Sequence, residues 1–142
     1  MIWKKISDWL KANRLSLNVK KSKLLLFHSK QSNFDSNNIS IKLDGCKLDP
    51  AENVQYLGVY IDNFLSWDFH ITQLSNKLSR ANGILSKLRN FTTKETLLSV
   101  YYAIFYSHMI YGFLVWSNNY KNIENITILQ KSVYTYYTFG TI

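Results

Sequence analysis

The sequence predicts an α+β fold, in which a small antiparallel sheet with one helix is followed by a three-helix bundle. Hydrophobic residues make up 46% of the 142 residues and aromatic residues 15%, which is enough for a packed core. Between residues 39 and 61, hydrophobic residues alternate with polar ones, a pattern typical of strands. From Trp67 onward they recur every three or four residues, which is typical of helices.

The N-terminal residues predict a helix, a strand and a loop. In the helix, predicted over residues 2–12, apolar side chains recur at helical spacing at Ile2, Ile6, Trp9 and Leu10. Residues 24–27 form an apolar run that is too short for a helix and predicts a buried strand. The polar, Asn- and Ser-rich residues 29–38 predict a loop.

The middle of the chain predicts strands. Residues 39–43 alternate apolar and polar side chains, and Asp44–Gly45 predicts a hairpin turn into residues 46–49. Pro50 has no backbone N–H group and is expected to end that strand. Residues 54–61 alternate again and predict one further, continuous strand.

Three helices are predicted after Trp67. The first carries an apolar stripe at Ile71, Leu74, Leu78, Ala81, Leu85 and Leu88. Lys77, Arg80 and Lys87 share a side that is turned from this stripe by roughly 130°, at about 100° per residue. The pattern Thr92-x-x-Glu95 is typical of a capping box and predicts a second helix that runs through residue 108. Residues 122–137 predict the third.

The net charge of +8 is unevenly distributed along the chain. Residues 1–30 carry eight Lys and Arg side chains against one Asp, and residues 77–94 carry five against no acidic residue. Residues 31–76, between them, carry two against six. Basic zones attract phosphate groups, so nucleic acid is a candidate partner, and a solvated surface is the alternative. The single cysteine, Cys46, favours a reducing, intracellular compartment without separating nucleus from cytoplasm.

Residues 97–116 contain no Lys, Arg, Asp or Glu and are long enough to cross a bilayer. Their tyrosines are scattered rather than gathered at the ends, and Ser107–His108 lies near the middle, where polar groups are costly. A buried bundle helix is therefore favoured over a membrane span. A membrane-associated helical protein remains the alternative, and it predicts partition into detergent.

Three segments follow one another in a fixed order: Asn18-Val-Lys-Lys-Ser22, Gln55-Tyr-Leu-Gly-Val59 and Leu65-Ser-Trp-Asp-Phe-His-Ile71. Together they resemble the part of a non-LTR retrotransposon (jockey-like) reverse transcriptase that follows its catalytic Tyr-x-Asp-Asp hairpin. The resemblance extends from about Trp9 to Lys131. It implies a fragment of an RNA-directed DNA polymerase, with the C-terminal part of the palm in residues 1–66 and a helical thumb in residues 67–142.

The resemblance implies roles for three lysines. The family pattern Leu-x-x-Asn-x-x-Lys-Thr is matched by Leu15, Asn18, Lys21 and Ser22. Lys21 would then lie near the triphosphate, as a candidate general acid toward the departing pyrophosphate. Lys20 and Lys23 would contact nucleic acid. The alternative for all three is the solvated end of a strand.

The resemblance also implies a nucleic-acid interface in two other segments. Tyr56, Leu57 and Gly58 would form a primer grip, with the backbone freedom of Gly58 allowing a close approach, and a β-bulge is the alternative. The first thumb helix would lie along an RNA–DNA template–primer duplex. Its residues Lys77, Arg80 and Lys87 would hold sugar and phosphate groups without reading sequence, and Gly83 would approach the wide minor groove.

Two further interpretations concern the helical part. Trp67 is expected to be a core anchor rather than a base-stacking platform, and His70 a helix-start residue with no catalytic role. The third helix departs from the family, because Leu129-Gln-Lys131 is not followed by the arginines of relatives. This departure puts a nucleic-acid contact by the third helix in doubt.

The acidic residues predict no metal site and no bound cofactor in this chain. The family transfers nucleotides with paired Mg²⁺ ions held by carboxylates, whereas no two aspartates are adjacent in this sequence. The candidate acids show no convergent pattern: Asp44, Asp49, Glu52, Asp62 and Asp68. Mg²⁺ would belong to the complete enzyme, and the missing upstream polymerase portion would be a partner. A stand-alone nucleic-acid-binding module is the alternative, and it predicts salt-sensitive binding of a hybrid duplex by a stable monomer.

Overall fold

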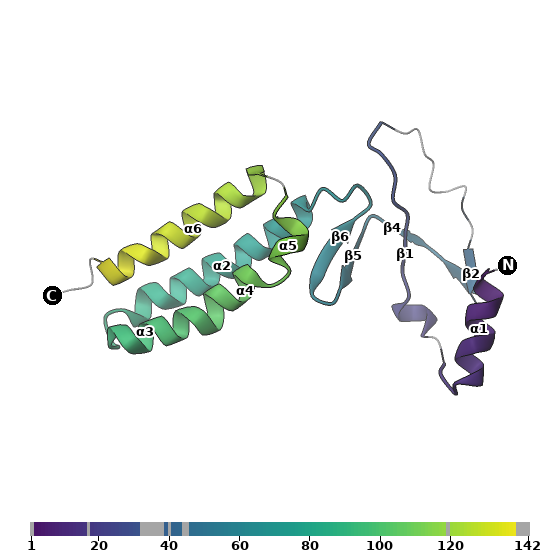
Figure 1. The fold of residues 1–142 in the computed structure, drawn as a ribbon, viewed down its shortest axis with the longest axis horizontal. Helices are drawn as coiled ribbons and strands as arrows, with labels where there is room; N and C mark the ends of the chain where they lie inside the picture. Colours follow the sequence, from purple (N-terminus) through teal and green to yellow (C-terminus); the bar gives the residue numbers. More distant parts are fainter. Residues whose placement is uncertain are drawn as a thin grey trace. The chain divides into compact units, whose positions relative to one another are not determined.

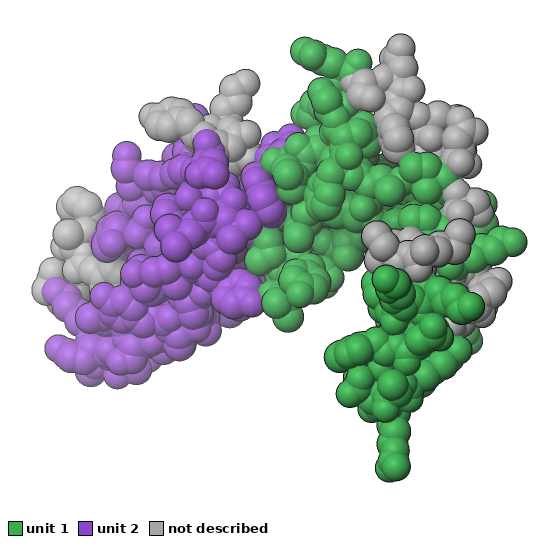
Figure 2. Space-filling model, turned by 45° about the vertical axis from the view of Figure 1, so that its right-hand side comes forward, with its two compact units in different colours: residues 1–65 green, residues 66–142 purple. Residues whose placement is uncertain are grey.

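The computed structural model describes residues 2–16, 18–31, 39, 41–43, 46–118 and 120–138 and confirms the α+β class. Its element order places one α-helix, a 3₁₀ turn and the described strands in the N-terminal part, and the other helices in the C-terminal part (Figure 1). The chain divides into two compact units, Met1–Leu65 and Ser66–Ile142, which Figure 2 shows in green and purple. The sequence had placed the boundary between residues 66 and 67.

The first unit begins with helix α1, Ile2–Ala12, over the residues that the apolar spacing predicts. Its end is closed by a Schellman motif, in which Leu15 N–H donates to Leu10 O (2.9 Å) and Arg14 N–H to Lys11 O (3.0 Å). Arg14 has a φ of 56°, the left-handed conformation that this motif requires at its first residue past the helix. An arginine therefore occupies a position where glycine is usual, so the sequence does not predict this helix end.

Within the described residues, the strands of the first unit pair in three two-stranded sheets rather than in one. Strands β2, Ile41–Leu43, and β3, Cys46–Leu48, are antiparallel, as predicted, although the expected turn residues Asp44 and Gly45 lie outside the described residues. Strand β1, Leu24–Leu25, pairs in parallel with β4, Pro50–Ala51. Strand β3 ends at Leu48, before Pro50, as predicted, and Pro50 then opens the separate strand β4. The first residue of a strand tolerates the missing N–H group.

The predicted continuous strand over residues 54–61 is instead a hairpin. Strand β5, Asn53–Tyr56, turns back into the antiparallel strand β6, Val59–Asp62. Leu57 and Gly58 form the turn, with φ angles of 47° and 84°. Positive φ at both central residues is the mark of a type I′ turn, whose twist matches that of the flanking strands. Gly58 therefore serves the turn, and the bulge interpretation was wrong.

The core that the described residues of the first unit form is small. Among them, Leu24 of β1 and Leu48 of β3 are the buried hydrophobic residues, and Leu26, Ile39 and Ile41 pack against them. The parallel pairing of β1 with β4, two residues after Leu48, brings these leucines together.

The second unit is a helical bundle in which α2 contacts each of the other long helical segments (Figure 1). Its elements are α2, Asp68–Leu88; α3, Lys94–Tyr101; η3, Tyr102–Tyr106; α4, Ser107–Ile110; α5, Phe113–Trp116; and α6, Tyr120–Thr138. The apolar stripe predicted for the first helix after Trp67 is buried at five positions and packed against the core at Leu88. Five side chains of the unit are completely enclosed: Trp116, Phe105, Leu78, Leu85 and Val133.

The predicted second helix begins one residue later than expected and is not uniform. Thr93, rather than Thr92, caps α3, and its hydroxyl accepts from the Thr96 N–H (3.3 Å). The Thr92 hydroxyl instead donates to Leu88 O at the end of α2 (3.0 Å). The capping-box spacing was thus misassigned because two threonines are adjacent.

The helix widens into a π-helical turn at η3, Tyr102–Tyr106, before α4 resumes the α-helical pattern. The Ser107 N–H donates to Tyr102 O, five residues back, as in a π turn. The Ser107 hydroxyl donates to Ala103 O, which gives that carbonyl a partner within the turn.

An exposed apolar surface follows η3, here called the α4–α5 surface: Ile110, Tyr111, Phe113, Leu114 and Val115. Leu114 is 88% exposed. Beside it, the enclosed Trp116 donates from Nε1 to Tyr111 O (3.0 Å), which fixes the short helix α5 to the preceding turn. Among the described residues, no helix has the length and apolar character needed to cross a membrane.

Candidate nucleic-acid interface

The residues just before helix α2 determine how the helix begins. Trp67 takes the helix N-cap position with a φ of 65°, and the Ser66 hydroxyl accepts from the Asp68 N–H (3.3 Å). The Trp67 side chain packs against the core of the second unit. The interpretation of Trp67 as a core anchor is therefore confirmed.

Lys77, Arg80 and Lys87 are all exposed on α2, while the apolar stripe of the same helix is buried. These three cations define what we call the basic face of α2. No acidic residue in the described part of the chain forms an ion pair with them. They span ten residues, or about 15 Å of helix at about 1.5 Å per residue. The face thus presents three uncompensated charges along one side of a rigid element.

Gly83 lies next to the basic face and is exposed. A Cβ atom added at Gly83 would meet nothing within 4 Å. Packing inside the unit therefore does not require glycine, although glycine in a helix interior costs about 1 kcal/mol relative to alanine. Its lack of a side chain leaves the helix backbone open to an external partner.

The remaining polar side chains near the end of α2 are tied to α6. Asn82 Nδ2 donates to Ser132 Oγ (2.7 Å), and the Arg89 guanidinium lies over the Tyr136 ring at 5.1 Å from its centroid. Arg89 is thus held by an aromatic ring and is not part of the basic face. These contacts fix the rotation of α2 and therefore the direction of its cations.

His70 is buried in the first turn of α2, with 6% of its surface exposed. Burial, and secondarily the positive charge of Lys77, lower the pKa of His70 from its ordinary value of 6.5. Its ring lies 5.9 Å from that of Trp116, between centroids. His70 therefore belongs to the core at the start of the helix.

In the first unit, Lys20, Lys21 and Lys23 are exposed around a 3₁₀ turn, η1, Val19–Lys21. Asn18 organises this turn, because its Oδ1 and its carbonyl oxygen both accept from the Lys21 N–H (3.2 and 3.1 Å). The Ser22 hydroxyl also donates to Asn18 O (3.0 Å). The Asn-x-x-Lys-Ser pattern thus has a local structural role, which is to hold the backbone that carries the lysines.

The other candidates of the first unit lie at the β5–β6 turn. Tyr56, Leu57 and Gly58 are exposed there, with Leu57 73% exposed. Strand β1, which follows the lysines, pairs with β4, whereas β5 pairs with β6. Strand pairing therefore does not bring these two sets of candidates together, while α2 does bring its own four onto one side.

The described acidic residues show no arrangement for a metal. Among the described residues, no group of three or more His, Cys, Asp or Glu side chains could hold a metal ion. Asp62 instead serves the chain after β6, where its Oδ1 accepts from the Phe64 N–H (2.9 Å).

Sequence reasoning missed two clusters. His28 and Asn63 are 35 residues apart, and His28 Nε2 lies 3.3 Å from Asn63 Nδ2, with the His28 ring 4.9 Å from that of Phe64. Nothing local in the sequence announces that pairing. The second cluster is a tyrosine-lined cavity in the helical unit. Its signal was present, because Lys94, Leu98, Tyr102 and Tyr106 recur every four residues.

In comparisons with known proteins, no family model, no curated protein and no solved structure matches this chain.

Proposed function

We propose that the helical unit binds an RNA–DNA duplex through the basic face of α2, as the template–primer-binding part of an RNA-directed DNA polymerase. The observation that carries this proposal is the exposed row Lys77, Arg80 and Lys87 without acidic partners among the described residues. The assignment to a polymerase rests on the order of the three sequence segments that resemble a reverse transcriptase.

The charges on α2 suit a backbone contact rather than a base contact. Ammonium and guanidinium groups that neutralise phosphates release condensed counterions, which favours binding without sequence preference. An RNA–DNA duplex offers a wide, shallow minor groove that a helix surface can approach. Gly83, beside the cations, leaves room for that approach.

Salt dependence of binding tests the proposal. We expect fluorescence anisotropy of a labelled RNA–DNA hybrid to report binding that weakens as potassium chloride increases. In the variant Lys77→Ala/Arg80→Ala/Lys87→Ala, the slope of log K against log salt should fall by up to about 2.7, at about 0.9 per lost phosphate contact.

A charge-matched control separates the basic face from net charge. Lys4, Lys5 and Lys47 are exposed and lie outside the proposed interface, so their triple alanine variant removes the same charge. This control should retain most of the slope. Equal losses in both triple variants, or a wild-type chain that does not bind the hybrid, would contradict the proposal.

Gly83 gives a second test within the same helix. A side chain at the exposed Gly83 meets no other part of the protein at its Cβ atom, so the melting temperature of Gly83→Leu should not fall, while the added side chain blocks the duplex and weakens binding. Ser99→Leu, at an exposed position of α3, is the control and should bind as the wild type does. Unchanged binding by Gly83→Leu would show that the duplex does not approach the helix there.

A further inference from the structure

The helical unit contains a cavity of about 410 Å³, and none of its lining residues belongs to α2 or its basic face. We call it the tyrosine pocket, and its lining residues are Lys94, Glu95, Leu98, Tyr101, Tyr102, Tyr106 and Tyr134. This volume lies in the range of small-molecule sites, about 300–1,000 Å³. The lining residues belong to α3, η3 and α6, so the whole pocket lies within the second unit.

The wall of the pocket is fixed to the hydrophobic core. Tyr101 is buried and stacks on the enclosed Phe105, with ring centroids 5.5 Å apart and an interplanar angle of 22°. Tyr102 meets Tyr101 edge to face at 5.2 Å and Tyr106 at 5.3 Å. Because these rings brace one another, a ligand would find the aromatic surface already in place.

The outer ring of this wall is accessible. Tyr102 is 53% exposed, and Leu98 and Tyr134 are exposed beside it. Two of the wall tyrosines stand at the ends of the π-helical turn, Tyr102–Tyr106. Single π turns inside α-helices occur frequently at functional sites. Here the turn sets the angle between two rings that line the pocket.

The pocket also has a polar side. Gln130 Nε2 donates to the Tyr134 hydroxyl (3.4 Å) on α6. Burial raises the pKa of the Tyr101 phenol above its ordinary value, which favours the neutral form further. Tyr101 and Tyr134 line the pocket, and a phenol hydroxyl can both donate to and accept from the edge of a flat heterocycle.

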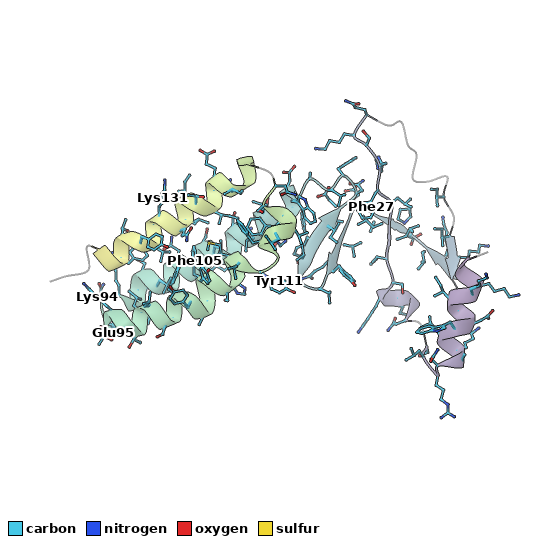
Figure 3. All side chains as sticks on the ribbon, viewed as in Figure 1. Phe27, Lys94, Glu95, Phe105, Tyr111 and Lys131 are labelled. Atoms are coloured by element: carbon cyan, nitrogen blue, oxygen red, sulfur yellow. The ribbon has the colours of Figure 1, made fainter. Side chains whose placement is uncertain are left out.

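Charged groups stand at the entrance. Lys94 and Glu95 are exposed at the start of α3 (Figure 3). The backbone N–H of Glu95 and the Thr93 hydroxyl lower the pKa of the Glu95 carboxyl, so this carboxylate is held toward the helix start. Lys94, whose charge also lowers the pKa of Glu95, is the cation at the entrance that an anionic group on a ligand can approach.

We infer that the tyrosine pocket binds a nucleobase, stacked on Tyr102, with the attached phosphate at Lys94. Every base has a flat π face and a polar edge, and stacking on aromatic side chains is tolerant of base identity. A quaternary ammonium ligand fits less well, because the positive charge of Lys94 at the entrance repels a cation. The base can belong to a free nucleotide or to an unpaired nucleotide of a strand. The inference does not depend on the duplex interface, since no α2 residue lines the pocket.

Titration calorimetry on the full chain with adenosine, adenosine monophosphate and oligoadenylate tests the inference. Tyr102→Ala should weaken binding of all three about tenfold or more, because stacking is lost, whereas Tyr102→Phe should bind within about twofold of wild type. Lys94→Ala should weaken the two phosphate-bearing ligands and leave adenosine unchanged. Measured in the triple alanine variant of the α2 basic face, which lacks the other proposed phosphate contacts, tighter binding of oligoadenylate than of the mononucleotide assigns the pocket to a strand, and equal binding assigns it to a free nucleotide.

Matched controls keep the test decisive. Tyr111 is 54% exposed and lies at the other end of the helices from Lys94 (Figure 3), so Tyr111→Ala should bind normally. The triple alanine variant of the α2 basic face should keep adenosine binding, which separates this pocket from the duplex interface. Absence of adenosine binding by the wild type, equal loss in Tyr111→Ala, normal binding by Tyr102→Ala, or tight binding of choline instead would overturn the inference.

Discussion

His70 shows how burial of one side chain couples the second unit to pH. Its lowered pKa means that the unfolded chain takes up a proton at a higher pH than the folded chain does. Between the folded pKa and about 6.5, the unfolded state therefore binds more protons. The contribution of His70 to the free energy of unfolding should be complete above this window and should decrease as the pH falls through it.

Chemical denaturation between pH 4 and pH 8 measures this effect, with the baseline slope set by the rest of the chain. His70→Phe cannot take up the proton, so the decrease across the window should become smaller than in the wild type. His108→Phe, at an exposed position of α4, is the matched control and should keep the wild-type decrease. Equal pH profiles for wild type and His70→Phe would show that another group dominates.

Single residues were predictable where their role depends on local spacing. The cations of α2 could be placed opposite the apolar stripe, because 100° per residue holds along a regular helix. The tyrosine pocket could not be assembled in this way. It combines residues of α3 and η3 with Tyr134 of α6, and the sequence carries no record of which helix faces pair.

Elements were predictable where the period was long and uniform. Helices α1, α2 and α6 follow apolar repeats and begin and end within two residues of the predicted ranges. The β5–β6 turn was missed because leucine is rarely found at positive φ, so the sequence Tyr-Leu-Gly-Val reads as continuous alternation. The parallel pairing of β1 with β4 joins residues that no local pattern connects.

The same turn gives a prediction at the scale of the hairpin. Leu57 adopts a φ of 47°, which is unfavourable for leucine. Its side chain is largely exposed, so replacing it removes little packing. Asparagine tolerates this conformation, and Asn-Gly is the favoured pair of a type I′ turn. Leu57→Asn should therefore stabilise the hairpin by about 1 kcal/mol, within the roughly 1–2 kcal/mol that a left-handed residue costs.

Hydrogen exchange at the amides of β5 and β6 measures the gain. Leu57→Ala shortens the side chain but keeps the unfavourable backbone, so it should give little or no gain. Gly58→Ala places a Cβ atom at a φ of 84° and should lose protection. Faster exchange in Leu57→Asn than in the wild type would contradict the turn assignment.

At the scale of the whole molecule, buried hydrophobic side chains are concentrated in the second unit. Its core includes the enclosed Phe105 and Trp116, whereas the described core of the first unit rests on Leu24 and Leu48. Local stability follows buried apolar contacts. Amides of α2, α3 and α6 should therefore exchange more slowly with solvent than those of β1 and β4, as measured by native-state hydrogen exchange.

A pair of core variants tests whether each unit depends on its own core. Phe105→Ala should lower the free energy of opening in the second unit by about 3–5 kcal/mol and leave exchange in the first unchanged. Leu48→Ala should act on the first unit alone. Equal effects of either variant on both units would show that the chain unfolds as one cooperative body.

The α4–α5 surface changes how one common assay is interpreted. Its five side chains offer amphiphiles a place to adsorb while the chain beneath them, at Trp116, stays enclosed. Uptake of mild detergent is then expected of a fully folded bundle. Replacing Leu114 and Val115 with serine should reduce the uptake of detergent without unfolding the protein. That result would show that detergent adsorbs to the α4–α5 surface and that its uptake does not require insertion of a helix into lipid.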